Sequence, residues 1–121
     1  MKILVVEDEP LIRLGMVSLV EDWGYTPLEA SNADEAIAQI ERDGDVRIII
    51  TDVDMPGSMD GVKLAHFVRH RWPPIQLIVI SGKIGANEVD LPVGARFFSK
   101  PCREEALLST IRELGDAGGA P

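Results

Sequence analysis

Blocks of consecutive apolar residues alternate along this chain with segments in which apolar residues recur every three or four positions. The run from Ile48 to Ile50 is the clearest block, and it predicts a strand buried on both faces, because a half-exposed strand would alternate apolar with polar residues. Similar blocks predict the other strands, and Pro27 assigns the second of them to a sheet edge. The five predicted strands span residues 2–6, 25–30, 48–52, 76–80 and 95–99.

The segments between these strands have the period of amphipathic helices. In the first, we expect the core-facing residues to be Ile12, Met16, Leu19 and Trp23. Asn32 precedes the second helix and is predicted to cap it. The predicted helices span residues 10–23, 33–43, 62–72 and 103–114, with Gly24, Gly44, Pro73 and Gly115 as their stops.

A strand followed by a helix, repeated along the chain, predicts an α/β fold. Right-handed connections between strands give a parallel sheet with helices on both faces. With the edge-like second strand outermost, the doubly wound, five-stranded sheet has the order 2-1-3-4-5. We assign residues 1–115 to one domain and residues 116–121, which are small and rich in glycine, to a flexible tail.

Composition narrows the class of protein. The chain has 121 residues, 45% apolar and 26% charged, as expected of a globular domain. It has no apolar run near the roughly 20 residues that cross a bilayer, so we expect no membrane partner. The single cysteine, Cys102, excludes an internal disulfide and suits the cytoplasm. The net charge of -8 argues against direct nucleic-acid binding, which needs a basic surface.

Four predicted strands end on polar side chains at what would be the same edge of the sheet. Glu7 and Asp8 follow the first strand, and Asp52 ends the third. Ser81 follows the fourth strand and Lys100 the fifth. Three carboxylates crowded into a partly desolvated crevice repel one another, which predicts a cation between them. Hard oxygen ligands, few in number, suit Mg2+, which binds through one or two carboxylates plus a phosphate.

Together these groups predict a phosphoryl-transfer site. In such a site a carboxylate attacks the transferred group while cations neutralise its charge. Asp52 would be the nucleophile and become an aspartyl phosphate, with Lys100 as a second cation and Ser81 as a hydroxyl donor. The chain has no nucleotide-binding loop of the G-x-x-x-x-G-K type, so we expect the phosphoryl group not to come directly from ATP.

Four separated motifs resemble those of the receiver domain of two-component response regulators. They correspond to the acidic pair, the phosphoacceptor loop, the switch hydroxyl and the lysine-proline motif of that family. In this chain they are residues 5–9, 52–56, 80–82 and 97–101. The resemblance extends from about Lys2 to Leu114 and implies the flavodoxin-like fold of CheY.

The resemblance also implies roles for the acidic residues. Asp52 would accept a phosphoryl group from a sensor histidine kinase or a phosphotransfer protein. Mg2+ would be coordinated by Asp8, Asp52 and the backbone carbonyl of Asp54, with Glu7 acting through water.

Further implied roles concern the last two strands. Lys100 would pair with the phosphoryl group through a loop in which the Lys100-Pro101 peptide bond is cis. Ser81 and Phe97 would be switch residues that pass the change to a downstream effector. The resemblance also makes a homodimer through the last strand and helices possible.

Three features depart from the usual pattern of the family. The loop of residues 55–61 is one residue longer, and Phe97 lacks the hydroxyl of the tyrosine that many relatives carry. The interval between Ser81 and Lys100 is short, which predicts a stunted or mobile element over residues 83–93.

Two other functions remain open from the residues. One is a small phosphatase or phosphotransferase that uses Asp52 and Asp54 on free substrates, although the chain has no cap to enclose a substrate. The other is a pseudo-receiver that binds partners without phosphorylation. We expect a switch that catalyses only its own phosphorylation and dephosphorylation, not a turnover enzyme. His66 and His70, one helical turn apart, are interpreted as surface residues because no third metal ligand accompanies them.

Overall fold

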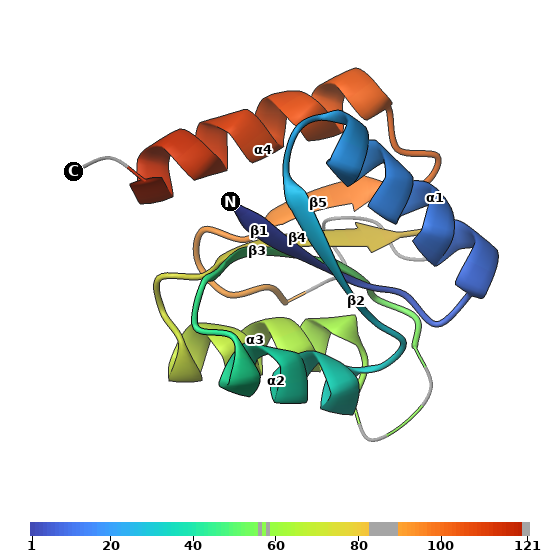
Figure 1. The fold of residues 1–121 in the computed structure, drawn as a ribbon. Helices are drawn as coiled ribbons and strands as arrows, with labels where there is room; N and C mark the ends of the chain where they lie inside the picture. The colour runs from blue at the N-terminus through green and yellow to red at the C-terminus, as the bar shows by residue number, and fades with distance from the viewer. Residues whose placement is uncertain (56, 58, 83–89, 120–121) are drawn as a thin grey trace.

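The computed structural model describes residues 1–55, 57, 59–82 and 90–119, the last four of these by their backbone alone. Strands and helices alternate along the described chain up to the fourth strand, after which the next described element is the fifth strand, followed by the last helix (Figure 1). The strands are β1 (Lys2–Val6), β2 (Thr26–Ala30), β3 (Val46–Asp52), β4 (Gln76–Ser81) and β5 (Arg96–Ser99). The helices are α1 (Pro10–Asp22), α2 (Ala33–Arg42), α3 (Gly61–Arg71) and α4 (Glu104–Gly119).

The strands form one parallel sheet in the order β2-β1-β3-β4-β5, which confirms the predicted fold class and strand order. In the central strand β3, Thr51 lies beside Val6 of β1 and Val79 of β4. Val6 is the last residue of β1, so the residue after it, Glu7, emerges next to Asp52. The register of the sheet therefore sets these two acids at the same edge.

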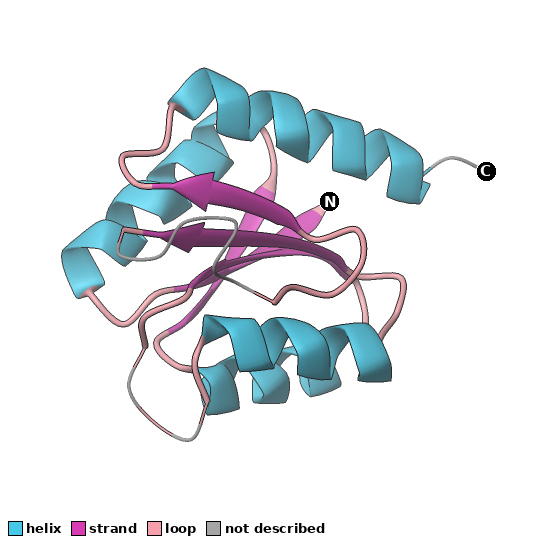
Figure 2. Ribbon diagram, turned by 180° about the vertical axis from the view of Figure 1, so that it is seen from behind, coloured by secondary structure: helices cyan, strands magenta, loops and turns pink. Residues whose placement is uncertain are grey.

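Two pairs of helices cover the sheet, α1 and α4 on one face and α2 and α3 on the other (Figures 1 and 2). Each face of the sheet carries a hydrophobic core, and the isoleucine run of β3 contributes to both. Ile49 packs in the core beneath α2 and α3, whereas Ile48 and Ile50 pack beneath α1 and α4. All three are at most 2% exposed, which confirms the prediction of a strand buried on both faces.

Local signals set several helix ends, and those at Asn32 and Gly24 were predicted. The side chain of Asn32 caps α2 by accepting a hydrogen bond of 2.8 Å from the N–H of Glu35. Gly24 follows the end of α1 with a φ of +92°, a conformation that favours glycine. Asp60 caps α3 in the same manner as Asn32 caps α2, by accepting from the N–H of Lys63 at 2.9 Å.

The packing face of α1 differs from the predicted one. Val20 is its buried residue, and Met16, Val17 and Trp23 pack beside it, whereas Ile12 is 49% exposed. The first half of α1 carries apolar residues on several sides, so its hydrophobic period does not select one face. The prediction that Ile12 faces the core is therefore wrong.

α4 continues through Gly115 and ends at Gly119. The prediction that this helix ends at Gly115 is therefore wrong. Residues 116–119, which were assigned to a tail, belong to the helix. Gly115 does not have the positive φ of a helix stop. A Cβ at this position would lie 3.0 Å from Cε of Met1, so the glycine leaves room for the Met1 side chain.

The short element predicted over residues 83–93 falls largely on residues 83–89, which lie outside the described residues. Residues 90–93 are described and are not helical. Among the described helices, none combines the length and the apolar character that a bilayer-crossing segment needs.

Candidate functional site

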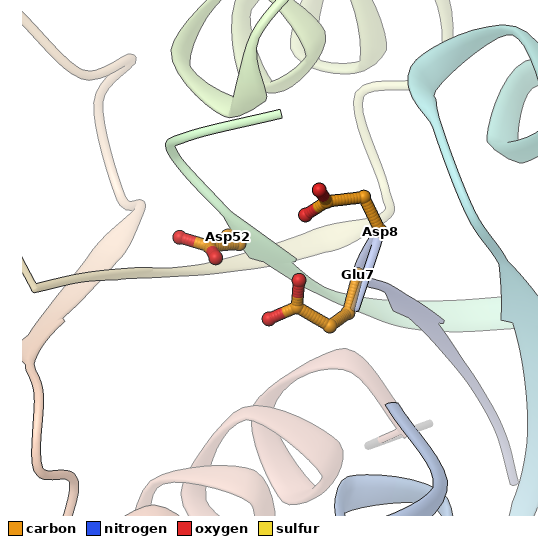
Figure 3. Close-up of side chains that lie close together, drawn as sticks. All are labelled: Glu7, Asp8 and Asp52. Atoms are coloured by element: carbon orange, nitrogen blue, oxygen red, sulfur yellow. The ribbon is translucent and has the colours of Figure 1, made fainter. Parts of the chain in front are cut away.

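The ends of β1 and β3 bring three acidic side chains together (Figure 3). Asp52 is the last residue of β3, and Glu7 and Asp8 directly follow β1. One carboxylate oxygen of each lies within 4.8 Å of the other two. Glu7 is 5% exposed and Asp52 is 9% exposed, so two of these carboxylates are largely withdrawn from water. The structure thus assembles the acidic cluster that the strand ends predict.

Lys100, which directly follows β5, brings a positive charge to this cluster. Its Nζ donates a hydrogen bond of 2.9 Å to Oδ2 of Asp52 and lies 3.7 Å from Oε1 of Glu7. Its backbone N–H donates to the carbonyl of Ser81 at 2.9 Å, which ties this loop to the end of β4. The Lys100-Pro101 peptide bond is cis, as predicted.

The crowding of charges is reflected in the pKa of Glu7, which is raised from 4.5 to about 7. Burial is the main cause, and the hydrogen bond with Asp8 and the charge of Asp52 add to it, whereas a backbone N–H and Lys100 act in the opposite direction. At Lys100, burial lowers the pKa, but the hydrogen bond and charge of Asp52 outweigh it, with help from Glu7 and Asp54, so the pKa is raised. The site therefore favours additional positive charge.

Backbone hydrogen bonds hold the segment that follows Asp52. The N–H of Val53 donates to the carbonyl of Ile80 at 2.9 Å, which extends the contact between β3 and β4 past the end of β3. The N–H of Asp54 donates to Oδ1 of Asp52 at 3.3 Å. Asp54, the predicted carbonyl ligand, is thereby held beside the carboxylate of Asp52, the predicted phosphoacceptor.

Gly61, the first residue of α3, is a site residue that the sequence analysis missed. Its N–H donates to the carbonyl of Val53 at 2.9 Å. A Cβ at residue 61 would collide with the carbonyl oxygen of Asp52 and lie 2.7 Å from the carbonyl carbon of Asp52. Glycine is therefore required for α3 to begin directly against the backbone of Asp52. The available signal was a glycine placed in the first turn of a helix, directly after its capping residue Asp60.

Arg13 of α1 also supports the site and was not predicted. Its Nη1 donates to the backbone carbonyl of Glu7 at 2.8 Å, and its Nε pairs with Oε1 of Glu29 on β2 at 3.2 Å. The N–H of Glu9 donates to the Glu7 carboxylate at 3.1 Å. These contacts fix the segment in which Glu7 and Asp8 leave β1.

The two predicted switch residues lie on neighbouring strands. Ser81 ends β4 and is buried. Phe97 lies on β5, where it is half-buried and packs against the core beneath α2 and α3. Their positions next to the lysine loop agree with the expected roles, and the switching itself stays a prediction.

A cavity of about 520 Å³ opens beside the acidic cluster and is bounded by α1 and the loop after β5. Its lining is mainly apolar and also contains charged residues. Burial raises the pKa of the Cys102 thiol, which keeps it in the unreactive protonated form. The apolar lining includes Ile12, Met16, Ile50, Ile80 and Cys102, and the charged residues are Glu7, Asp52 and Lys100.

The donor set of the cluster fits a hard divalent cation. All three side chains offer carboxylate oxygens, and no soft ligand lies among them. Asp8 is only half-buried, so the cluster is open to solvent on its side. A small cation that keeps several waters can therefore enter and retain part of its hydration shell.

Comparison with known proteins identifies the family. The model of the response regulator receiver domain family matches residues 3–112. The sensor kinase CckA of Brucella abortus is 37% identical over 116 residues, which are 93% of this chain but 12% of that protein. The hydrogenase transcriptional regulatory protein HoxA of Cupriavidus necator is 33% identical, over 97% of this chain and 24% of that protein. The chain thus spans a minor part of the length of these relatives.

Solved structures show the same similarity. The receiver domain of the hybrid histidine kinase CckA has a TM-score of 0.78 at 31% identity, covering 94% of this chain and 98% of that one. A CheY-like receiver domain from Methanospirillum hungatei has a TM-score of 0.83 at 25% identity, covering 98% and 95%. Because the family model matches all but the two ends of the chain and these solved receiver domains share its fold, this protein belongs to the response regulator receiver domains.

Proposed function

We propose that this domain is a phosphorylation-controlled switch of a two-component system, with Asp52 as its phosphoacceptor. A sensor histidine kinase or a phosphotransfer protein donates the phosphoryl group from a phosphohistidine. The observation that carries this proposal is the clustering of Asp52 with two other carboxylates and with the ammonium group of Lys100, 2.9 Å away. Stability alone does not explain this arrangement, because charges withdrawn from water are costly to the fold.

Mg2+ would be held by Asp8, Asp52 and the backbone carbonyl of Asp54, with Glu7 acting through a water molecule. When bound, the ion neutralises negative charge on the phosphoryl oxygens. The raised pKa of Glu7 supports this assignment, since a site that resists a further negative charge gains from a cation.

In the transfer step, a carboxylate oxygen of Asp52 forms a bond to phosphorus as the bond from phosphorus to the donor imidazole nitrogen breaks. The imidazole keeps the electron pair of the broken bond and then takes up a proton from solvent. Lys100 already contacts Oδ2 of Asp52, so its ammonium group is in place to pair with the phosphoryl oxygens.

The outer side of α1 offers the phosphodonor a docking surface. Leu11 is 82% exposed and Leu14 is 59% exposed, and Ile12 lines the cavity that opens on Asp52. Adjacent apolar side chains left in water next to a reactive group are typical of a protein-protein contact. A donor bound over the first half of α1 would present its phosphohistidine to Asp52.

Phosphorylation would be transmitted through Ser81 and Phe97 to a downstream effector protein or domain. The relatives named as transcriptional regulators suggest an effector of that kind, in the cytoplasm, with nucleic acid contacted by the effector and not by this domain. A homodimer through β5 and α4 stays a prediction. The domain would catalyse its own phosphorylation and dephosphorylation only.

A small phosphodonor tests the proposal. Incubation with acetyl phosphate and Mg2+ should add one base-labile phosphate per chain, as measured by intact mass. Asp52→Asn, or a chelator, should abolish the labelling. Asp54→Asn should preserve it, because Asp54 is assigned to the metal through its backbone carbonyl and its side-chain charge only adds to that around Lys100.

The other functions predict different results in the same assay. Repeated turnover of varied phosphomonoesters would identify a phosphatase. A complete lack of labelling, with the protein folded and Mg2+ present, would identify a pseudo-receiver. Either result would overturn the proposed switch.

A further inference from the structure

The outer face of α3 has a composition unlike the rest of this acidic chain. Its solvent-exposed residues recur at spacings of three and one, which places them on one side of the helix. Along its length α3 contains no aspartate or glutamate, although the chain carries a net charge of -8. We define the α3 face as Lys63, His66, Phe67, His70 and Arg71.

An aromatic cluster lies at the end of this face. Phe67, which is 36% exposed, makes an edge-to-face contact with Trp72, with the ring centroids 6.1 Å apart. The guanidinium group of Arg71 lies 5.2 Å from the centroid of the Trp72 ring. The α3 face therefore combines positive charge with exposed apolar surface.

A cavity of about 320 Å³ continues from this cluster, at the edge of the sheet opposite to Asp52. Arg71 and Trp72, which join it to the α3 face, form part of its wall. Ile40 and Ile75 contribute apolar surface, and Pro73 and Pro74 form the adjoining loop. Asp43 and Arg47 add one charge of each sign to the lining, so the cavity itself suits the apolar side chain of a partner and not its carboxylates. The cavity is large enough for one bulky side chain of a partner.

The needs of the fold do not explain the charges of the α3 face. A cation in the first turn of a helix opposes the helix dipole, and Lys63 occupies that turn. Arg69, by contrast, is used within the fold, because its Nη1 donates to the carbonyls of Pro73 and Ile75 at 2.8 and 3.2 Å. Arg71 pairs with Glu41 of α2 at 3.4 Å, and since both side chains are more than half exposed, a competing carboxylate can replace Glu41.

We propose that the α3 face binds a short acidic segment of a partner protein that also carries a bulky apolar side chain. Carboxylates of the segment pair with Lys63 and Arg71, and the apolar side chain packs against Phe67 and Trp72 and enters the 320 Å³ cavity. A nucleic acid or an anionic membrane is disfavoured because the net charge of -8 repels an extended polyanion. A short segment meets only the local positive charge, because salt screens the rest of the surface beyond about 8 Å.

The experiment uses a defined probe and two variants. The probe is a short synthetic peptide of aspartate and glutamate residues around one tryptophan, titrated into isotope-labelled protein and followed by amide chemical shifts. The test variant is Phe67→Ser combined with Arg71→Glu. The matched control is Arg103→Glu, which reverses one exposed positive charge at the start of α4. The amide spectrum of each variant before the titration verifies that it is folded, and this check does not depend on phosphorylation of Asp52.

We expect saturable shifts confined to α3 and the Trp72 loop. Affinity should fall about tenfold or more in the test variant, stay unchanged in the control and weaken as salt rises. The absence of saturable shifts, or equal binding by the test variant and wild type, would overturn the proposal. If the amide shifts of the α3 face change with protein concentration alone, the face binds a second copy of this chain. If the protein co-sediments with anionic vesicles, the face binds a membrane. Either result would also overturn the proposal.

Discussion

Replacing Glu7 by glutamine should stabilise the metal-free protein at neutral pH, although Glu7 belongs to the candidate site. The pKa of this buried carboxyl is raised from 4.5 to about 7, so the fold resists its ionisation. Each pH unit of displacement corresponds to about 1.4 kcal/mol, so keeping Glu7 ionised costs the folded state about 3 kcal/mol. Glutamine removes that cost and can still accept the hydrogen bond from the N–H of Glu9.

The attraction of Lys100, 3.7 Å away, is already included in the raised pKa of Glu7. The net gain is nevertheless smaller than the full cost, because the buried amide of glutamine is itself a polar group withdrawn from water. We expect the free energy of unfolding to rise by about 1–3 kcal/mol. With an unfolding entropy of about 2 cal/mol/K per residue, a chain of 121 residues should then gain about 4–12 °C in Tm.

The sign of the pH dependence follows from the direction of the shift. Below pH 4.5 Glu7 is protonated in both the folded and the unfolded chain, so the wild type carries no penalty. Between pH 4.5 and about 7 the unfolded chain loses its proton while the folded chain retains it, so the stability of the wild type falls. The advantage of Glu7→Gln should therefore be absent in acid, grow over this interval and stay constant above it.

Thermal unfolding followed by circular dichroism, in a chelator and across this pH interval, measures the effect. Glu9→Gln is the matched control, because it removes the same formal charge from an exposed neighbour. Saturating Mg2+ should narrow the difference, since a bound cation offsets the repulsion. An advantage that does not vary with pH, or a less stable Glu7→Gln protein in mild alkali, would refute the electrostatic reasoning.

Four further predictions concern the site and its surroundings. Gly61→Ala should lower the free energy of unfolding, measured by urea denaturation, by about 2 kcal/mol or more, because the Cβ of the alanine collides with the Asp52 backbone. An unchanged free energy of unfolding would mean that α3 can shift without cost. Mg2+ at about ten times its Kd should raise the free energy of unfolding of the wild type by about 1.4 kcal/mol and leave that of Asp8→Asn unchanged, as measured by the melting temperature. An equal rise in the melting temperature of both proteins would mean that the ion binds elsewhere. Lys100→Met should slow labelling by acetyl phosphate and lower Tm, because two carboxylates lose their cation; unchanged labelling kinetics would exclude a role for the ammonium group. Leu14→Lys should slow phosphoryl transfer from a phosphorylated kinase, because it places a charge on the exposed apolar surface of α1. Labelling by acetyl phosphate, which needs no docking, should be unchanged. An equal loss of both reactions would argue against docking on α1.

The sheet and the acidic cluster could be predicted because each leaves a local signal in the sequence. Ile48 to Ile50 is apolar without interruption because neighbours cover both sides of β3. Glu7 and Asp52 are each the first acidic residue after an apolar run, so parallel strands in register suffice to bring them together. That inference requires no knowledge of loops or side-chain packing.

What could not be predicted depends on contacts between segments that are distant in the sequence. Gly115 was predicted to end its helix because glycine commonly does so. In the structure the helix continues, and the glycine makes room for the side chain of Met1 from the other end of the chain. The buried face of α1 is set by the sheet and α4, and not by the composition of α1, so Val20 could not be distinguished from Ile12. The support that Arg13 gives to Glu7 likewise arises from three elements meeting at one edge of the sheet.

The start of α3 has a mechanical consequence. The helix abuts the carbonyl of Asp52 with no side chain between them, and its other end carries Arg71 next to Trp72. An α-helix of eleven residues is a stiff rod about 16 Å long, so it cannot absorb a displacement at one end by bending. Any movement of the Asp52 backbone must push or tilt α3 as a unit, and the aromatic cluster at its far end moves with it.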